Sequence, residues 1–158
     1  SLEAMLLVGC STAHTLGLVT LNEQLLWSLT QSVERHRLGA RVGAILSMEP
    51  QLDEAGLIGL FANPDAYLTR FQDTARRAIA AHADAIIPAE GILAEVVAAA
   101  GITEIDGAAV LDGIGIPITY AEMLARLWQR TGLRVGRRWH HAKPPPEVMD
   151  LDPATRRR

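Results

Sequence analysis

The run ADAIIPA, residues 83–89, limits the possible folds more than any other segment of the sequence. It is apolar almost throughout, so the strand that it predicts is buried on both faces. Strands of that kind belong to parallel sheets that helices cover on each side. A helical pattern follows at residues 91–100, as such a sheet requires. We therefore expect an α/β protein.

The rest of the chain repeats this alternation of strand and helix. A capping box supports one helix start, because Thr20 is placed as its N-cap and Glu23 follows three residues later. Pro117 predicts a kink or break in the last helical segment. Parallel strands are predicted near 15–19, 42–47, 84–88 and 103–105, and helical segments at 2–12, 21–37, 64–82, 91–100 and 108–131.

This order of elements predicts a three-layer αβα fold around a short four-stranded parallel sheet with right-handed crossovers. We divide the chain into an N-terminal helix at 1–14, an α/β lobe at 15–132, and an extended C-terminal arm and tail at 133–158. The sequence RVGRRW at 134–139 is compatible with either a strand or an extended arm.

Composition excludes several classes of protein. The net charge of −3 over 158 residues does not suggest a nucleic-acid partner. Apolar stretches end well before the roughly 18 residues that a membrane-spanning helix needs, so no membrane partner is expected. Cys10 is the single cysteine, so no intrachain disulfide can form and a reducing, cytoplasmic location is favoured. The chain does not begin with Met, which is typical of a processed or truncated product.

Parallel sheets bind ligands at the carboxyl ends of their strands. In this sequence that rule selects the loops Thr20–Asn22, Ser47–Pro50 and Pro88–Gly91. Glu90 lies between a buried strand and a helix start, where a carboxylate is suited to general acid/base chemistry. The alternative interpretation is that Glu90 only caps the helix that follows it.

Several segments, in the same order, resemble the second lobe of proteins of the aspartate/glutamate/hydantoin racemase superfamily. They are LGLVTLNEQLLWSLTQSVERHRLGARVGAI (16–45), ADAIIPAEGIL (83–93), ITEIDGAAVLDGIGI (102–116) with AEMLARL after it, and RVGRRWHHAKPPPE (134–147). The resemblance implies an isomerase that uses no cofactor and no metal and acts on a small chiral carbon acid of amino-acid or hydantoin type. In that family two cysteines on two lobes remove and return the α-proton.

The resemblance also implies a set of site residues, with two departures from the family. Glu90 stands where the second-lobe cysteine is expected, and we expect the first lobe to be absent from this sequence. Thr20, Asn22 and Ser47 are expected to surround the substrate with hydroxyl and amide groups, and the site loop includes Pro88 and Gly91 beside Glu90.

Cys10 has a competing interpretation. The stretch GCSTAH at 9–14 resembles the first-lobe cysteine loop of the family, which would make residues 5–9 a strand and Cys10 a catalytic thiol. Against this, a crossover helix does not fit before the next strand, because it needs about a dozen residues. The other interpretation is a small apolar residue in a packed helix.

Three functions remain open at this point. The first is a racemase that uses Glu90 and, in the alternative alignment, Cys10. The second is a carboxylate-binding or scaffold protein without catalysis, and the third is a decarboxylase-type lyase that needs one proton donor. A homo-oligomer, dimer or higher, is expected because the helices at 2–12 and 118–131 carry apolar faces that a missing lobe would cover.

Overall fold

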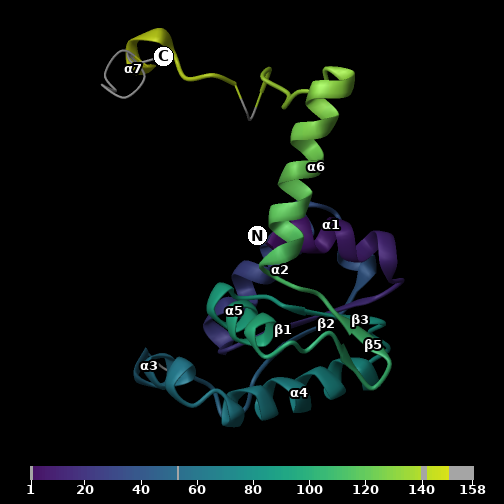
Figure 1. Cartoon of the computed structure of the whole chain (residues 1–158), viewed down its shortest axis with the longest axis vertical. Helices are drawn as coiled ribbons and strands as arrows, with labels where there is room; N and C mark the ends of the chain where they lie inside the picture. Colours follow the sequence, from purple (N-terminus) through teal and green to yellow (C-terminus); the bar gives the residue numbers. More distant parts are fainter. Residues whose placement is uncertain (1, 53, 140–141, 150–158) are drawn as a thin grey trace. The chain divides into compact units, whose positions relative to one another are not determined.

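The computed structural model describes residues 2–52, 54–139 and 142–149. The chain divides into two compact units, residues 1–121 and 122–158. The first unit is an α/β lobe whose sheet is sandwiched between helices (Figure 1). Its elements are α1 (Leu2–Thr12), β1 (Leu16–Thr20), the 3-10 turn η1 (Glu23–Leu25), α2 (Leu26–Arg35), the 3-10 turn η2 (Gly39–Arg41), β2 (Val42–Ser47), α3 (Glu54–Ala62), α4 (Asp65–Ala80), β3 (Ala85–Pro88), α5 (Gly91–Ala99), β4 (Glu104–Ile105) and β5 (Ala108–Val110).

Helix α6 (Gly115–Thr131) begins in the first unit and ends in the second, where the short helix α7 (Pro146–Met149) follows. Residues 134–139 form no strand. Within the described part of the chain, no helix is both long enough and apolar enough to cross a membrane.

The sheet has the order β2-β1-β3-β5-β4, and the first four strands in that order are parallel. The expected α/β class is thus confirmed, with five strands in place of four. β1 lies between β2 and β3, so the chain leaves β1 on one side toward β2 and returns on its other side as β3. Such a reversal of strand order is where parallel sheets bind ligands.

The fourth parallel strand was predicted at the wrong place. Residues 104–105 form β4, which pairs antiparallel with β5, and β5 itself is the parallel neighbour of β3. The turn between them is Asp106-Gly107, whose φ angles of 49° and 84° are those of a tight two-residue hairpin. Residues 108–110 were expected to be helical, and their pairing with β3 overrides the local helical preference of alanine.

Two apolar clusters form the core, one on each face of the sheet. On one face α1 and α2 cover β1 and β3 through residues such as Leu6, Val33 and Leu18. On the other face α4 and α5 pack through residues such as Phe71 and Leu93. Figure 1 shows α1 above the strands and α4 below them. Both faces of β1 and β3 are buried, as the apolar run at 83–89 predicts.

Two predicted helix starts differ in detail. Thr20 is the last residue of β1 and caps no helix; Asn22 precedes the η1 turn, and its side chain makes no capping bond. Pro117 neither kinks nor breaks α6, because it lies in the first turn of that helix. Backbone N–H groups in a first turn have no helical partner, so a proline there removes no hydrogen bond.

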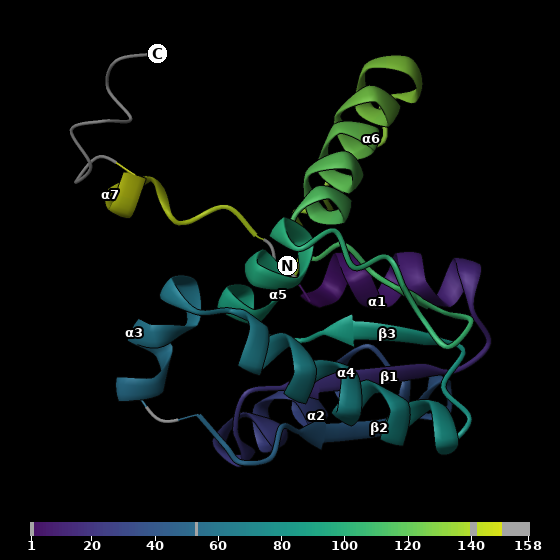
Figure 2. The same cartoon turned by 60° about the horizontal axis from the view of Figure 1, so that its bottom comes forward.

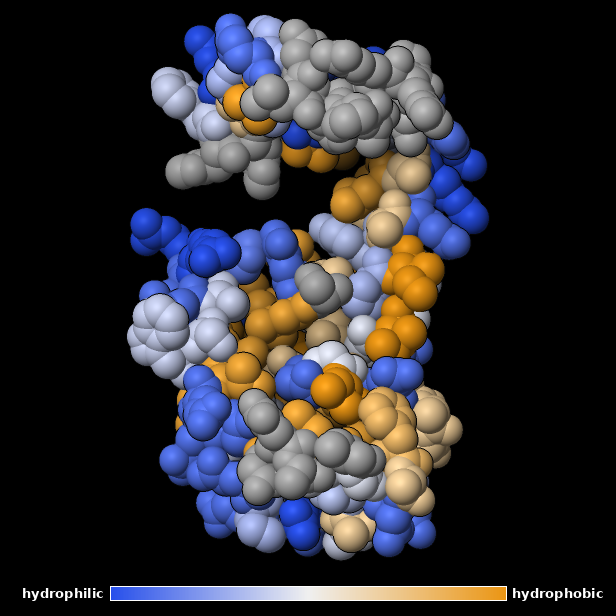
Figure 3. Space-filling model, turned by 90° about the vertical axis from the view of Figure 1, so that its left-hand side faces the viewer, coloured by the Kyte–Doolittle hydropathy of each residue, from blue (hydrophilic) through white to orange (hydrophobic). Residues whose placement is uncertain are grey.

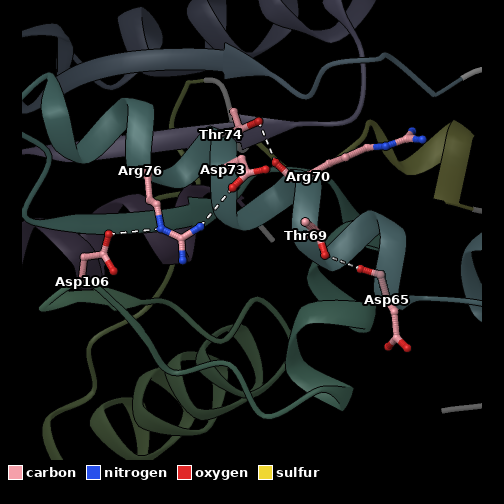
Figure 4. Close-up of polar contacts among 7 residues, drawn as sticks. All are labelled: Asp65, Thr69, Arg70, Asp73, Thr74, Arg76 and Asp106. Carbon is pink, nitrogen blue, oxygen red and sulfur yellow. Dashed lines mark hydrogen bonds and ion pairs between the residues drawn. The ribbon is translucent and has the colours of Figure 1, made fainter.

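Charged side chains fasten the β4–β5 hairpin to α4. Arg76 contacts the carboxylates of Asp106 and Asp73 at 3.2 and 3.0 Å (Figure 4). Within the same helix the Thr69 and Thr74 hydroxyls donate to the carbonyls four residues earlier. The hairpin is therefore held at the edge of the sheet by the helix that covers its face.

Candidate functional site

The carboxyl ends of the parallel strands bring together most of the predicted site residues. Thr20 at the end of β1 is the register partner of Ser47 at the end of β2. On the other side of β1, Val19 is the partner of Pro88, the last residue of β3. Backbone bonds continue the pairing past the strands, because Met48 N–H donates to Thr20 O and Ala89 N–H donates to Val19 O, each at 2.8 Å. We call this end of the lobe the carboxyl edge.

Two buried polar atoms at this edge have no hydrogen-bond partner within the described residues. They are Oγ1 of Thr20, a residue with no exposed surface, and Oδ1 of Asn22. The loop after β1 contacts the loop after β2 through a hydrogen bond that Glu23 N–H donates to Oε1 of Gln51 at 3.2 Å. A buried polar group without a partner costs about 1–3 kcal/mol, and one that persists in a native structure calls for an explanation such as a ligand.

Glu90 is the N-cap of α5. Its backbone is extended, and its Oε2 accepts a hydrogen bond from the N–H of Leu93 at 3.0 Å. The capping interpretation of this residue is therefore confirmed, together with the prediction that its carboxylate reaches the backbone amides of the next helix. The side chain is half-buried, and Gly91 beside it is the exposed first residue of α5.

The carboxyl edge is rich in carboxylates. The segments that follow the four parallel strands are residues 21–25, 48–54, 89–91 and 111–114, and they contain six acidic residues and no lysine or arginine. Two arginines of α4 contact one of these segments: Arg77 pairs with Glu49 at 3.5 Å and Arg70 donates to Pro50 O at 3.4 Å. The strand arrows in Figure 2 point toward the face of the lobe that Figure 3 shows. On that face of the lobe, apolar side chains gather among hydrophilic ones.

Cys10 lies at the other end of the strands. Residues 5–9 belong to α1, so the alternative in which they form a strand is wrong. The carbonyl of Cys10 accepts a hydrogen bond at 3.0 Å from Arg41, which directly precedes β2. The structure therefore brings Thr20, Asn22, Ser47, Pro88 and Gly91 to one edge with Glu90 and leaves Cys10 out of that group.

Asp112 is a residue of this edge that the sequence reasoning missed. It follows β5, and its Oδ1 accepts hydrogen bonds from the N–H groups of Ile114 and Gly115 at 2.9 and 2.8 Å. The Asp112-Gly113 pair is typical of a turn and could have indicated this loop, but residues 108–131 were predicted to be helical. Glycine is required at 113, because a Cβ there would lie 2.5 Å from the Cβ of Ala94 in α5. Among the described residues, no group of three or more His, Cys, Asp or Glu side chains is arranged to hold a metal ion.

Comparison with known proteins identifies the fold. No family sequence model matches the chain, and a search of curated proteins finds no significant match. The solved structures that share its fold include allantoin racemase from Pseudomonas fluorescens, with a TM-score of 0.72 and 21% identity, and allantoin racemase from Klebsiella pneumoniae, with a TM-score of 0.71 and 16% identity. They cover 92% and 96% of this chain, whereas the chain covers 57% and 60% of theirs. The chain thus has the fold of part of a racemase, as the sequence resemblance implied.

Proposed function

We propose, from the fold shared with allantoin racemases, that this chain is one lobe of a racemase-type protein that binds a small chiral carbon acid at the carboxyl edge. Glu90 is the proposed base, which removes the α-proton of the ligand and returns it without a cofactor. The setting that we propose is cytoplasmic. The site comprises Thr20, Asn22 and Ser47 with the loop Pro88–Gly91 around Glu90.

The observation that carries this proposal is the pair of unpartnered atoms on Thr20 and Asn22. Both lie at the carboxyl end of β1, where the strand order reverses, and a ligand there would supply the missing hydrogen bonds. Glu90 follows the neighbouring strand β3. Its Oε2 is held by Leu93, which fixes the carboxylate at the edge and leaves Oε1 for a ligand proton.

The charges of the edge favour one of the two expected substrate types. The described loops of the edge hold Glu23, Glu49, Glu90 and Asp112 and no basic residue, a charge that repels a substrate carboxylate. A neutral ring of the hydantoin type carries N–H groups that can donate to Asn22 Oδ1 and meets no such repulsion. We therefore place hydantoin-type compounds ahead of amino acids as the substrate class.

A second candidate is a binding protein without catalysis. It is favoured by one observation, the hydrogen bond that commits Glu90 to capping α5. A carboxylate that only caps a helix moves no proton, while Thr20 and Asn22 would still bind a ligand. The lyase alternative also needs only one proton donor and shares the same residues.

Binding is tested by titrating the protein with 5-substituted hydantoins and following backbone amide signals by NMR. We expect shifts that gather at Thr20, Asn22 and Glu90, and weaker binding by the Thr20→Val variant. Thr74→Val is the matched control, because Thr74 is equally buried but its hydroxyl already donates to Arg70 O at 2.9 Å. Shifts scattered over the surface, or equal binding by both variants, would contradict the proposed site.

A further inference from the structure

The two compact units of the chain carry opposite charges. Residues 1–121 contain 14 acidic and six basic side chains, so the formal charge of the lobe is −8. Residues 122–158 contain four acidic and nine basic side chains, so the second unit has a charge of +5. The modest net charge of −3 for the chain conceals this asymmetry.

The segment 122–139 is both basic and apolar, and we call it the basic arm. It contains five arginines and one acidic residue, Glu122. Apart from Leu127, which is half-buried, every residue in it is exposed. Its exposed apolar side chains are Met123, Leu124, Trp128, Leu133, Val135 and Trp139, with exposed fractions between 43% and 80%. Large apolar side chains grouped in this way are typical of an interaction surface.

The carboxyl edge of the lobe has the complementary properties. Its loops hold six acidic residues and no basic ones. One exposed apolar side chain, Ile114, lies in these loops, and the helices that follow β1 and β2 carry two more, Trp27 in α2 and Phe61 in α3; their exposed fractions are 42%, 73% and 57%. The carboxyl edge and the basic arm are therefore opposite in charge, and both carry apolar side chains that contact would bury.

We propose that the basic arm of one copy of this chain docks on the carboxyl edge of a second copy. Because each copy has one arm and one edge, a reciprocal exchange closes a twofold-symmetric dimer. The arms then cover the open side of the candidate site and bring arginines to loops that contain none. This inference is independent of whether Glu90 moves a proton.

The charge of the lobe favours a second copy over other partners of a basic helix. Nucleic acids and anionic membranes would attract the arm, but both would repel a lobe of charge −8 to which the arm is joined. The lobe of another copy attracts the arm instead. Leu124 and Met123 add aliphatic surface, which protein interfaces use and phosphate backbones do not.

The test is analytical ultracentrifugation of the whole chain over the micromolar range at two ionic strengths. We expect a reversible dimer at low salt that weakens at about 1 M salt, where the Debye length falls to about 3 Å. The arm variant Arg130→Glu/Arg134→Glu and the edge variant Glu23→Lys/Glu49→Lys should each raise the dimer dissociation constant by about tenfold or more. Glu34→Lys is the control: it reverses one acidic charge near the end of α2, before η2 and β2 begin, and should leave dimerisation unchanged.

Mixing the two charge-reversed variants distinguishes this interface from any other. Equal amounts of the arm variant and the edge variant should form a heterodimer, because one of its two arm–edge contacts pairs wild-type surfaces and the other pairs reversed charges. Circular dichroism melting curves establish that each variant is folded. A wild-type chain that stays monomeric, a dimer that neither salt nor the arm variant weakens, or a monomer that binds phosphatidylserine vesicles or DNA through the arm would overturn the proposal.

Discussion

The carboxylate of Glu90 accepts a hydrogen bond from the backbone N–H of Leu93 at 3.0 Å. This contact gives Glu90 a structural role that exists whether or not the residue is catalytic. Any loss of activity on mutation must therefore be separated from a loss of stability. Paired variants, one of which keeps the contact, separate the two effects.

Replacing Glu90 by alanine removes the cap of α5. We expect the free energy of unfolding to fall by about 1 kcal/mol, as for other N-cap residues. Urea denaturation measures the change, with Glu95→Ala as the control, because Glu95 is exposed on the same helix. Equal stability of the two variants would show that the bond to Leu93 contributes nothing measurable.

Thr20→Val is expected to stabilise the protein. Valine has nearly the same shape as threonine and removes a buried hydroxyl that has no partner among the described residues, so the free energy of unfolding should rise by about 1 kcal/mol. Thr74→Val removes a hydroxyl that donates to Arg70 O, so the free energy of unfolding of that variant should decrease. If Thr20→Val is instead destabilising, the Thr20 hydroxyl has a partner in the protein and needs no ligand.

Arg41, directly before β2, binds the end of α1 and the loop that follows it. Its guanidinium donates to the carbonyls of Cys10, Ala13 and His14 at 3.0, 2.6 and 2.7 Å. Arg41→Ala leaves these acceptors without a partner and should lower the free energy of unfolding by about 1–3 kcal/mol. The exposed Arg35 provides the control Arg35→Ala, and thermal melts of the two variants should differ clearly. Similar melting temperatures would mean that water replaces the guanidinium without loss.

Gly17 allows α4 to approach β1 closely. A Cβ at this position would lie 2.8 Å from the Cβ of Ala78 and 3.0 Å from that of Ala83. Gly17→Ala should therefore destabilise the lobe by about 1–3 kcal/mol through overpacking. Gly136→Ala, where a Cβ would meet nothing within 4 Å, should change stability by less than about 0.5 kcal/mol. Equal stability of the two variants in urea would refute the close packing.

The central part of the fold could be predicted from the sequence because its signals are local and strong. The apolar run at 83–89 and the segment around Leu18 predicted buried strands, the segment around Ala44 predicted a third strand, and helices were predicted between them. The β4–β5 hairpin could not be predicted in the same way. Ala108 and Ala109 favour a helix locally, and only pairing with β3 makes them a strand.

The site was predictable only in part, for a different physical reason. The rule that ligands bind at the carboxyl ends of strands located Thr20, Ser47 and Glu90 correctly at one edge. A capping box assigned Thr20 a hydrogen bond that it does not make, because the helix starts later than the box suggests. Asp112 escaped notice because its position depends on where β5 ends, and β5 had been read as a helix.

Hydrogen exchange in deuterated water measures whether Glu90 exchanges a proton with a carbon acid bound at the carboxyl edge. One enantiomer of a 5-substituted hydantoin is incubated with protein, and loss of its C5 proton is followed by NMR against buffer alone. We expect exchange faster than in buffer for the wild-type chain and for Glu95→Gln, and the buffer rate for folded Glu90→Gln. Exchange by Glu90→Gln at the wild-type rate would show that Glu90 is not the base, and a wild-type chain that binds the hydantoin without accelerating exchange would show that the edge only binds it.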